Sequence, residues 1–245
     1  MPINNSNIAD YDIAVIGGGI QGVGVAQAAA AAGYTVAVFE QTGIASATSS
    51  KSSKLIHGGL RYLESGQFKL VRKSLLERER LIELAPGLVK PVPFYIPIYK
   101  QTSRKSWEIG VGLFLYRILG SFKRYTRFKH LAINKNKTPP IQGLRNTDLK
   151  VVFQYYDAQT DDRLLTQAVM HSAQSLGATL YCPIKVIQLN FKEDGYHIRT
   201  ESTQGMADMV PDTIRAKFIV NVAGPWANDV LAKVSGTPVE TVEYD

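Results

Sequence analysis

Short apolar runs alternate with small-residue and amphipathic stretches along the chain. Residues 12–16 (DIAVI) and 34–40 (YTVAVFE) are apolar runs typical of buried strands. Residues 22–32 between them are almost all Ala, Val and Gly, which predicts a helix that ends at Gly33. Strand, tight turn, helix and strand make one right-handed βαβ unit. The chain therefore begins with the core of a parallel sheet.

Later segments continue this alternation. Residues 67–84 place apolar positions among charges, which predicts an amphipathic helix. Residues 85–99 contain four prolines and must leave the helix as an extended chain, where we place a first domain boundary. The other elements that we predict are a helix at 107–119, a strand at 151–156, a helix from 161 or 162 to about 176, two strands joined by 193–195, and a buried strand at 218–222.

Three glycines follow the first strand with the spacing GxGxxG, at Gly17, Gly19 and Gly22. The first makes the tight turn, the second lets the backbone approach a pyrophosphate, and the third lets helix and sheet pack closely. The helix N-terminus then presents free N–H groups to an anion. Glu40 ends the second strand, where a carboxylate accepts hydrogen bonds from a ribose and disfavours a 2′-phosphate. The unit predicts a dinucleotide site, without separating NAD from FAD.

Composition is that of a folded enzyme-sized body. The 245 residues are 45% hydrophobic and 20% charged, which excludes a coiled coil and a disordered tail. Cys182 is the only cysteine, so no intrachain disulfide forms and we expect a reducing, cytoplasmic setting. The start has no signal-peptide pattern, no apolar stretch is long enough to span a membrane, and we assign no metal ligands.

The basic excess is confined to the middle of the chain. Residues 61–150 carry 19 basic and 6 acidic side chains, a net +13, against −1 for residues 1–60 and −5 for residues 151–245. Such a patch attracts a phosphorylated substrate, anionic lipid or nucleic acid, or is only a solvated face. Nucleic acid is disfavoured because no recognisable reading motif is present. The apolar helix at 107–119, followed by basic residues, fits either a membrane-surface helix or a buried one.

Residues 48–64 read TSSKSSKLIHGGLRYLE. Together with GGGIQGVG at 17–24, this stretch resembles the FAD-dependent glycerol-3-phosphate dehydrogenases, in the amino-acid-oxidase-like flavoprotein superfamily. The likeness continues through LVRKSLLERERLIELAPGLVKPVPFYIP, LFLYRILG, YYDAQTDD and NVAGPWAND, so it covers most of residues 10–230. The chain ends near half the family's usual length, so we expect it to lack the C-terminal part of the substrate site.

The resemblance implies an α/β fold, with a Rossmann-like FAD-binding domain (a parallel sheet with helices and a β-meander) and part of an interleaved antiparallel substrate domain. We expect residues 1–90 to be the first part of the FAD-binding domain. Residues 91–150 are then an inserted basic segment of the substrate or cap domain. Residues 151–245 are a substrate-domain strand followed by the second part of the FAD-binding domain.

The resemblance also assigns site residues. Arg61 and Tyr62 match residues of the substrate-phosphate pocket, and a guanidinium offers a bidentate fork to phosphate. His57 either assists removal of the substrate's hydroxyl proton or packs beside the flavin, and we favour the structural role. Trp226 is expected to pack behind the turn at residues 223–224. The expected cofactor-binding residues are Gly17, Gly18, Gly19, Ile20, Gly22, Glu40, Thr48, Ser49, Ser50, Ser53, Lys54, Leu55, His57, Val186, Ala223 and Gly224.

The function implied is a flavoprotein oxidoreductase of glycerol metabolism, with FAD as its cofactor. It would oxidise sn-glycerol 3-phosphate to dihydroxyacetone phosphate and pass electrons to a membrane quinone, or to oxygen as in the oxidase relatives. We expect a cytoplasmic protein that contacts the inner face of the membrane peripherally. One alternative is a related flavin oxidoreductase acting on an amine or hydroxy acid, with Arg61 binding a carboxylate. Another is an inactive FAD-binding fragment.

Overall fold

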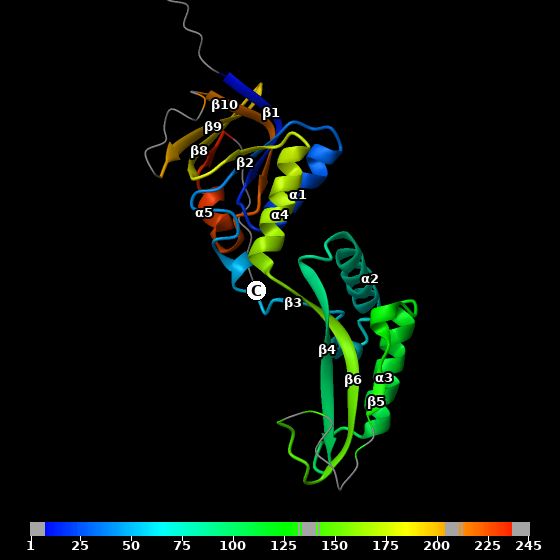
Figure 1. Cartoon of the computed structure of the whole chain (residues 1–245). Helices are drawn as coiled ribbons and strands as arrows, with labels where there is room; N and C mark the ends of the chain where they lie inside the picture. Colours follow the sequence, from blue (N-terminus) through cyan, green and yellow to red (C-terminus); the bar gives the residue numbers. More distant parts are fainter. Residues whose placement is uncertain are drawn as a thin grey trace, which may run out of the picture. The chain divides into compact units, whose positions relative to one another are not determined.

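The structure of the chain, a computed structural model, describes residues 8–131, 133, 141, 143–203, 211 and 213–236. It divides into two compact units (Figure 1). The first unit comprises residues 1–52 and 162–245, and the second comprises residues 53–161. The first unit is thus made of two separate stretches of chain.

The first unit is built on a seven-stranded sheet. Its strands are β1 (Ile8–Ile16), β2 (Val36–Phe39), β7 (Thr179–Tyr181), β8 (Ile184–Lys192), β9 (Gly195–Ser202), β10 (Thr213–Asn221) and β11 (Val234–Ser235). Their order is β11-β8-β9-β10-β1-β2-β7, and the neighbours β10, β1, β2 and β7 are parallel. The strands β8, β9 and β10 form an antiparallel meander. This sheet confirms the predicted parallel core with a meander.

Two helices, α1 (Ile20–Ala31) and α4 (Asp162–Ser175), lie side by side against this sheet (Figure 1). Alternate strand residues separate the two faces, as period-2 geometry requires. Val15 packs in the cluster that includes Ala26 of α1 and Ala173 of α4. Ala14 and Ile16 pack in the cluster on the other face. The 3-10 helices η1 (Thr48–Ser50) and η5 (Gly224–Trp226) and the short helix α5 (Ala227–Leu231) complete the unit.

The second unit is an antiparallel sheet with two helices. Its elements are β3 (Leu55–Ile56), η2 (Leu60–Leu63), α2 (Phe68–Leu84), β4 (Val89–Tyr99), α3 (Ser106–Leu119), η3 (Arg124–Thr126), β5 (Lys129–Leu131) and β6 (Leu149–Thr160). The sheet runs β3-β6-β4, and β5 also pairs with β6. Leu113 of α3 is buried against Val151 and Phe153 of β6, and Tyr116 against Val71 and Leu75 of α2.

The proline-rich stretch is the long strand β4, which pairs with β6. Pro91, Pro93 and Pro97 occupy positions of the same parity along this strand. In an antiparallel strand the N–H groups of alternate residues point to the same side. The three missing N–H groups therefore all belong on the side away from β6. Prolines are tolerated on such an edge because they remove no ladder hydrogen bond.

The expected segments differ from the observed units. We divided the chain at residues 90 and 150, whereas the units meet at Ser52–Ser53 and Asp161–Asp162. The reason is strand pairing, because β6 binds both β3 and β4 and gathers everything between them into one unit. The strands predicted at 12–16 and 218–222 are also longer, starting at Ile8 and Thr213, because these two residues pair in register. No helix among the described residues is long and apolar enough to cross a membrane.

Candidate functional site

A cavity of about 940 Å³ lies in the first unit, at the carboxyl ends of three neighbouring parallel strands. Its walls include the segments that follow β1, β2 and β10. Register aligns these strand ends, because Ile16 pairs with both Phe39 and Asn221. Ligands of open parallel sheets bind at this edge of the sheet, and the volume is typical of a ligand site.

The turn after β1 is closed so tightly that only glycine fits. Gly17 has a φ of +119° and donates its N–H to the Phe39 carbonyl at 2.9 Å. A Cβ on Gly17 would lie 2.6 Å from the carbonyl oxygen of Val222, and a Cβ on Gly22 would lie 1.9 Å from that of Gly17. These are backbone contacts that no rotamer change relieves. The two glycines therefore let α1 sit directly on the ends of the strands.

Helix α1 begins at Ile20 and presents its N-terminus to the cavity. Its first turn contains no acidic residue, and Gly19 offers no side-chain cap. The Ile20 N–H donates to the hydroxyl of Ser49 at 2.9 Å, which ties the loop at residues 48–51 to the helix start. The first N–H groups of a helix have no intrahelical acceptors and carry a partial positive charge. This end of the cavity suits an anionic group.

Glu40 stands at the end of β2 and lines the same cavity. Its Oε2 accepts the Gly18 N–H at 2.8 Å. Its Oε1 accepts the N–H and the hydroxyl of Thr42 at 2.8 and 2.9 Å. The carboxylate thus joins the glycine turn to the loop after β2. Oε1 also accepts the Gly43 N–H at 3.4 Å, whereas Oε2 accepts only the Gly18 N–H among the described residues. Oε2 therefore keeps one acceptor position for a ligand hydroxyl.

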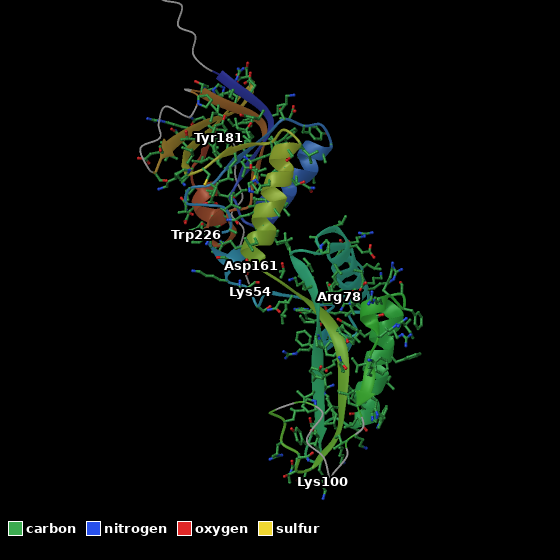
Figure 2. The ribbon with its side chains drawn as sticks, viewed as in Figure 1. Lys54, Arg78, Lys100, Asp161, Tyr181 and Trp226 are labelled. Carbon is green, nitrogen blue, oxygen red and sulfur yellow. The ribbon has the colours of Figure 1, made fainter. Side chains whose placement is uncertain are left out.

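Sequence reasoning missed part of the cavity wall. Trp226, labelled in Figure 2, was expected to pack behind the turn at residues 223–224. It lines the cavity and is 48% exposed. Lys51, Lys185 and Lys233 also line the cavity, and the Lys233 Nζ donates to the Val186 carbonyl at 3.0 Å. Lys51 and Lys185 each lie within two residues of a predicted site residue, a proximity that could have identified them. Nothing local to the sequence identifies Lys233.

The predicted cofactor residues fall into three groups. Gly22 and Ser50 adjoin the cavity without lining it, Gly22 against the Gly17 carbonyl and Ser50 donating its hydroxyl to the Ala47 carbonyl at 3.0 Å. Those that line the cavity are Gly17, Gly18, Gly19, Ile20, Glu40, Thr48, Ser49, Val186, Ala223 and Gly224. Those that belong to the second unit are Ser53, Lys54, Leu55 and His57, together with the substrate candidates Arg61 and Tyr62. The individual roles of all these residues stay predictions.

The second unit carries the substrate candidates on one short segment, residues 57–62, which we call the loop although Arg61 and Tyr62 lie in η2. His57, Arg61 and Tyr62 are exposed, whereas Gly58 is buried between them. The Gly58 N–H donates to the hydroxyl of Tyr116 at 3.0 Å and to Asp157 Oδ1 at 3.2 Å. The backbone between these exposed side chains is therefore hydrogen-bonded to buried residues of the second unit.

Helix α3 has one buried face and one exposed apolar face. Leu113 and Tyr116 are buried, as expected if this helix packs inside the protein, which is one of the two interpretations that the sequence left open. Trp107, Val111 and Phe114, with exposed fractions of 64, 58 and 51%, lie at i, i+4 and i+7 and form an exposed stripe. We call this the α3 stripe. The exposed basic residues Lys105, Lys123 and Arg124 stand at its two ends.

The sequence profile of the family described as FAD dependent oxidoreductase matches residues 12–243. A glycerol-3-phosphate dehydrogenase of Pseudomonas aeruginosa is 40% identical over 223 residues, covering 88% of this chain and 40% of its own length. A D-erythritol 1-phosphate dehydrogenase of Brucella abortus is 38% identical, covering 92% of this chain and 44% of its own. The crystal structure of the glycerol-3-phosphate dehydrogenase from Bacillus halodurans, complexed with FAD, is 26% identical with a TM-score of 0.63, covering 94% of this chain and 38% of that one. The chain spans about 40% of the length of the curated relatives that it matches.

Proposed function

The chain belongs to the FAD dependent oxidoreductase family, and from that premise we propose that its first unit binds FAD in the cavity beyond β1, β2 and β10. One observation carries this proposal: the glycine turn is closed by backbone contacts, so that the N-terminus of α1 faces the cavity beside Glu40. Such a turn lets backbone N–H groups approach a pyrophosphate closely. When bound, FAD supplies a two-electron acceptor for a hydride.

The residues lining the cavity fit the parts of this cofactor. The backbone amides at the start of α1 would hold the pyrophosphate, because a helix N-terminus favours anions. Glu40 would accept from the adenosine ribose through Oε2, since that oxygen accepts only the Gly18 N–H within the described part of the chain. Val186 would lie beside the adenine, and Ala223 and Gly224 would approach the cofactor with backbone rather than side chain.

The substrate proposed for the whole protein is a polyol phosphate, with sn-glycerol 3-phosphate first among them. The names of the curated relatives support this class. Oxidation takes a hydride from the carbinol carbon and a proton from its hydroxyl, which yields dihydroxyacetone phosphate. Arg61, exposed in the second unit, would bind the phosphate through its guanidinium, with Tyr62 adding a directional donor. His57 is the nearby candidate for taking the hydroxyl proton.

Spectra and turnover test these assignments separately. The purified protein, or the protein titrated with FAD, should show flavin absorption bands in the blue and near-ultraviolet. Turnover is then measured with a dye acceptor on glycerol 3-phosphate, D-erythritol 1-phosphate and an amino acid. Faster turnover of either phosphate supports the proposal that Arg61 and Tyr62 bind a substrate phosphate, whereas turnover of the amino acid alone would contradict it. A yellow protein that turns over none of them would leave only FAD binding.

We also propose that the protein passes its electrons to a quinone while it contacts an anionic membrane through the α3 stripe. Apolar residues between basic ends are what an interfacial helix presents to such a surface. Co-sedimentation with vesicles containing phosphatidylglycerol should occur and should weaken when Trp107 and Phe114 are both changed to Ser. Phe218→Ser is the matched control, because Phe218 is 67% exposed on the first unit. Equal binding of all variants, or no binding by the wild type, would refute the contact.

A further inference from the structure

A fully buried ionic cluster lies inside the second unit. Arg78 of α2, labelled in Figure 2, is completely buried, and its Nη1 contacts Asp157 Oδ1 of β6 at 2.7 Å. Its Nη2 contacts Glu79 Oε1 at 3.0 Å, and both carboxylates are buried too. Buried ion pairs contribute little net stability, because the desolvation of the charges offsets their attraction. Stability alone is therefore a weak reason for this arrangement.

The acceptor at the centre of the cluster is Asp157 Oδ1. It receives three donors: the Arg78 guanidinium at 2.7 Å, the hydroxyl of Tyr116 at 2.7 Å and the Gly58 N–H at 3.2 Å. The Gly58 N–H also reaches the Tyr116 hydroxyl oxygen at 3.0 Å. Burial, and after it the charge of Asp157, raise the pKa of Tyr116, so this hydroxyl stays protonated and remains a donor. Hydrogen bonds thus connect the buried cluster to the backbone amide of Gly58.

The backbone at that amide has no room to move toward the cluster. A Cβ on Gly58 would lie 2.3 Å from both Leu75 Cδ2 and the Tyr116 hydroxyl oxygen. Gly59 comes next, in the left-handed region with a φ of +72°, and η2 starts directly after it. Leu60 of η2 packs against both helices of the unit. The chain from residue 57 to residue 62 is therefore pinned at Gly58, turned at Gly59 and packed down at Leu60.

We propose that Tyr116, Asp157 and Arg78 are positioning residues. Tyr116 and Asp157 accept the Gly58 N–H, Arg78 pairs with Asp157, and together they hold His57, Arg61 and Tyr62 in the arrangement that binds the substrate phosphate. This inference rests on the proposed function, because that function assigns the loop to the substrate. The three positioning residues are buried and act through the loop. They do not touch the substrate.

Amide hydrogen exchange of the full chain tests the anchoring without any turnover. Tyr116→Phe removes the hydroxyl and keeps the packed ring, and we expect exchange across residues 57–63 to rise about tenfold, as for loss of one hydrogen bond. Exchange in α2 and β6 should stay unchanged. Thr126→Val is the matched control, because it deletes another buried hydroxyl, bound to the Lys123 carbonyl at 2.7 Å. Unchanged exchange at 57–63, or an equal rise in α2 and β6, would overturn the anchoring.

A second pair of variants covers the case in which Tyr116→Phe folds poorly. Asp157→Asn keeps an acceptor oxygen, whereas Asp157→Leu keeps only the volume. We expect the loop exchange of the Asn variant to lie between those of the wild type and the Leu variant. Identical exchange in the Asn and Leu variants would show that acceptance by Oδ1 is not what holds the loop.

Kinetics then test whether the anchored loop serves the substrate. In Tyr116→Phe the KM for glycerol 3-phosphate should rise about tenfold, with kcat changed less than about twofold, because ground-state and transition-state binding weaken together. An unchanged KM, with the loop loosened, would overturn the positioning role. If the wild-type protein turns over neither glycerol 3-phosphate nor D-erythritol 1-phosphate, the proposed substrate class fails on that assay. The exchange experiment still decides whether the cluster anchors the loop.

Discussion

The contact between Gly22 and the Gly17 carbonyl makes the sharpest prediction about the cofactor site. In Gly22→Ala the new methyl carbon would lie 1.9 Å from the Gly17 oxygen. A carbon and an oxygen approach each other to about 3.3 Å at closest in ordinary packing. Helix α1 must therefore retreat by about 1.4 Å from the strand ends, and its N-terminus retreats with it.

The cost comes from overpacking and from helix propensity. Forcing one extra methyl into a packed site costs about 1–3 kcal/mol, and a backbone clash belongs at the upper end of that range. Alanine gains about 1 kcal/mol over glycine inside a helix. Gly24→Ala isolates the second effect, since a Cβ on Gly24 of the same helix would meet nothing within 4 Å. The two variants should therefore differ by about 3 kcal/mol, or roughly 6–12 °C in Tm for a chain of this size.

Calorimetry and FAD titration of both variants check this reasoning. Gly24→Ala should match or exceed the wild-type Tm and bind FAD as the wild type does. Gly22→Ala should melt lower and bind FAD at least about tenfold more weakly, because moving the helix N-terminus lengthens its hydrogen bonds to the pyrophosphate. Equal Tm values and equal FAD affinities for the two variants would refute the close-packing account.

Three further predictions concern charged residues. Arg78→Met should lower the free energy of unfolding, measured in urea, by about 3–5 kcal/mol, since it leaves buried carboxylates unpaired. The control Arg80→Met, at an exposed arginine of the same helix, should change it by at most about 0.5 kcal/mol. Similar losses in the two variants would contradict the prediction. Glu40→Gln should weaken FAD binding about tenfold by calorimetric titration, because one acceptor oxygen becomes a donor; unchanged affinity would argue against the ribose contact. The hydrogen bond from Lys217 lowers the pKa of Asp12 from 3.8 to about 2. The wild type should therefore be more stable than Asp12→Asn above about pH 4, with the difference lost as the pH falls through about 2 in acid unfolding. A difference that is undiminished at pH 2 would refute it.

Much of the first unit could be predicted because its signals are local. The glycine spacing alone predicts the turn in which only glycine fits at positions 17 and 22. The period of the apolar residues separates strand from helix. Local signals also placed two helices of the second unit, because those predicted at 67–84 and 107–119 are observed at Phe68–Leu84 and Ser106–Leu119. The family suggested by the resemblance and the α/β fold are confirmed by the comparisons and by the sheet.

Other features depend on residues far apart in sequence. The prolines of β4 suggested a domain boundary, yet pairing with β6 about 60 residues later makes them an edge strand. Trp226 lines the cavity because β10 ends beside β1, and no local sequence pattern predicts that pairing.

The sequence by itself determined the glycine turn, the helix after it and the carboxylate at the end of the second strand. These depend on backbone conformation and residue size over a few neighbouring positions. Only the tertiary structure decided that Gly58, Tyr116 and Asp157 meet, with 58 and 99 residues separating the first from the other two. The physical reason is that hydrogen bonds between distant segments form only after strand pairing and helix packing have brought them together, and local periodicity carries no information about that pairing.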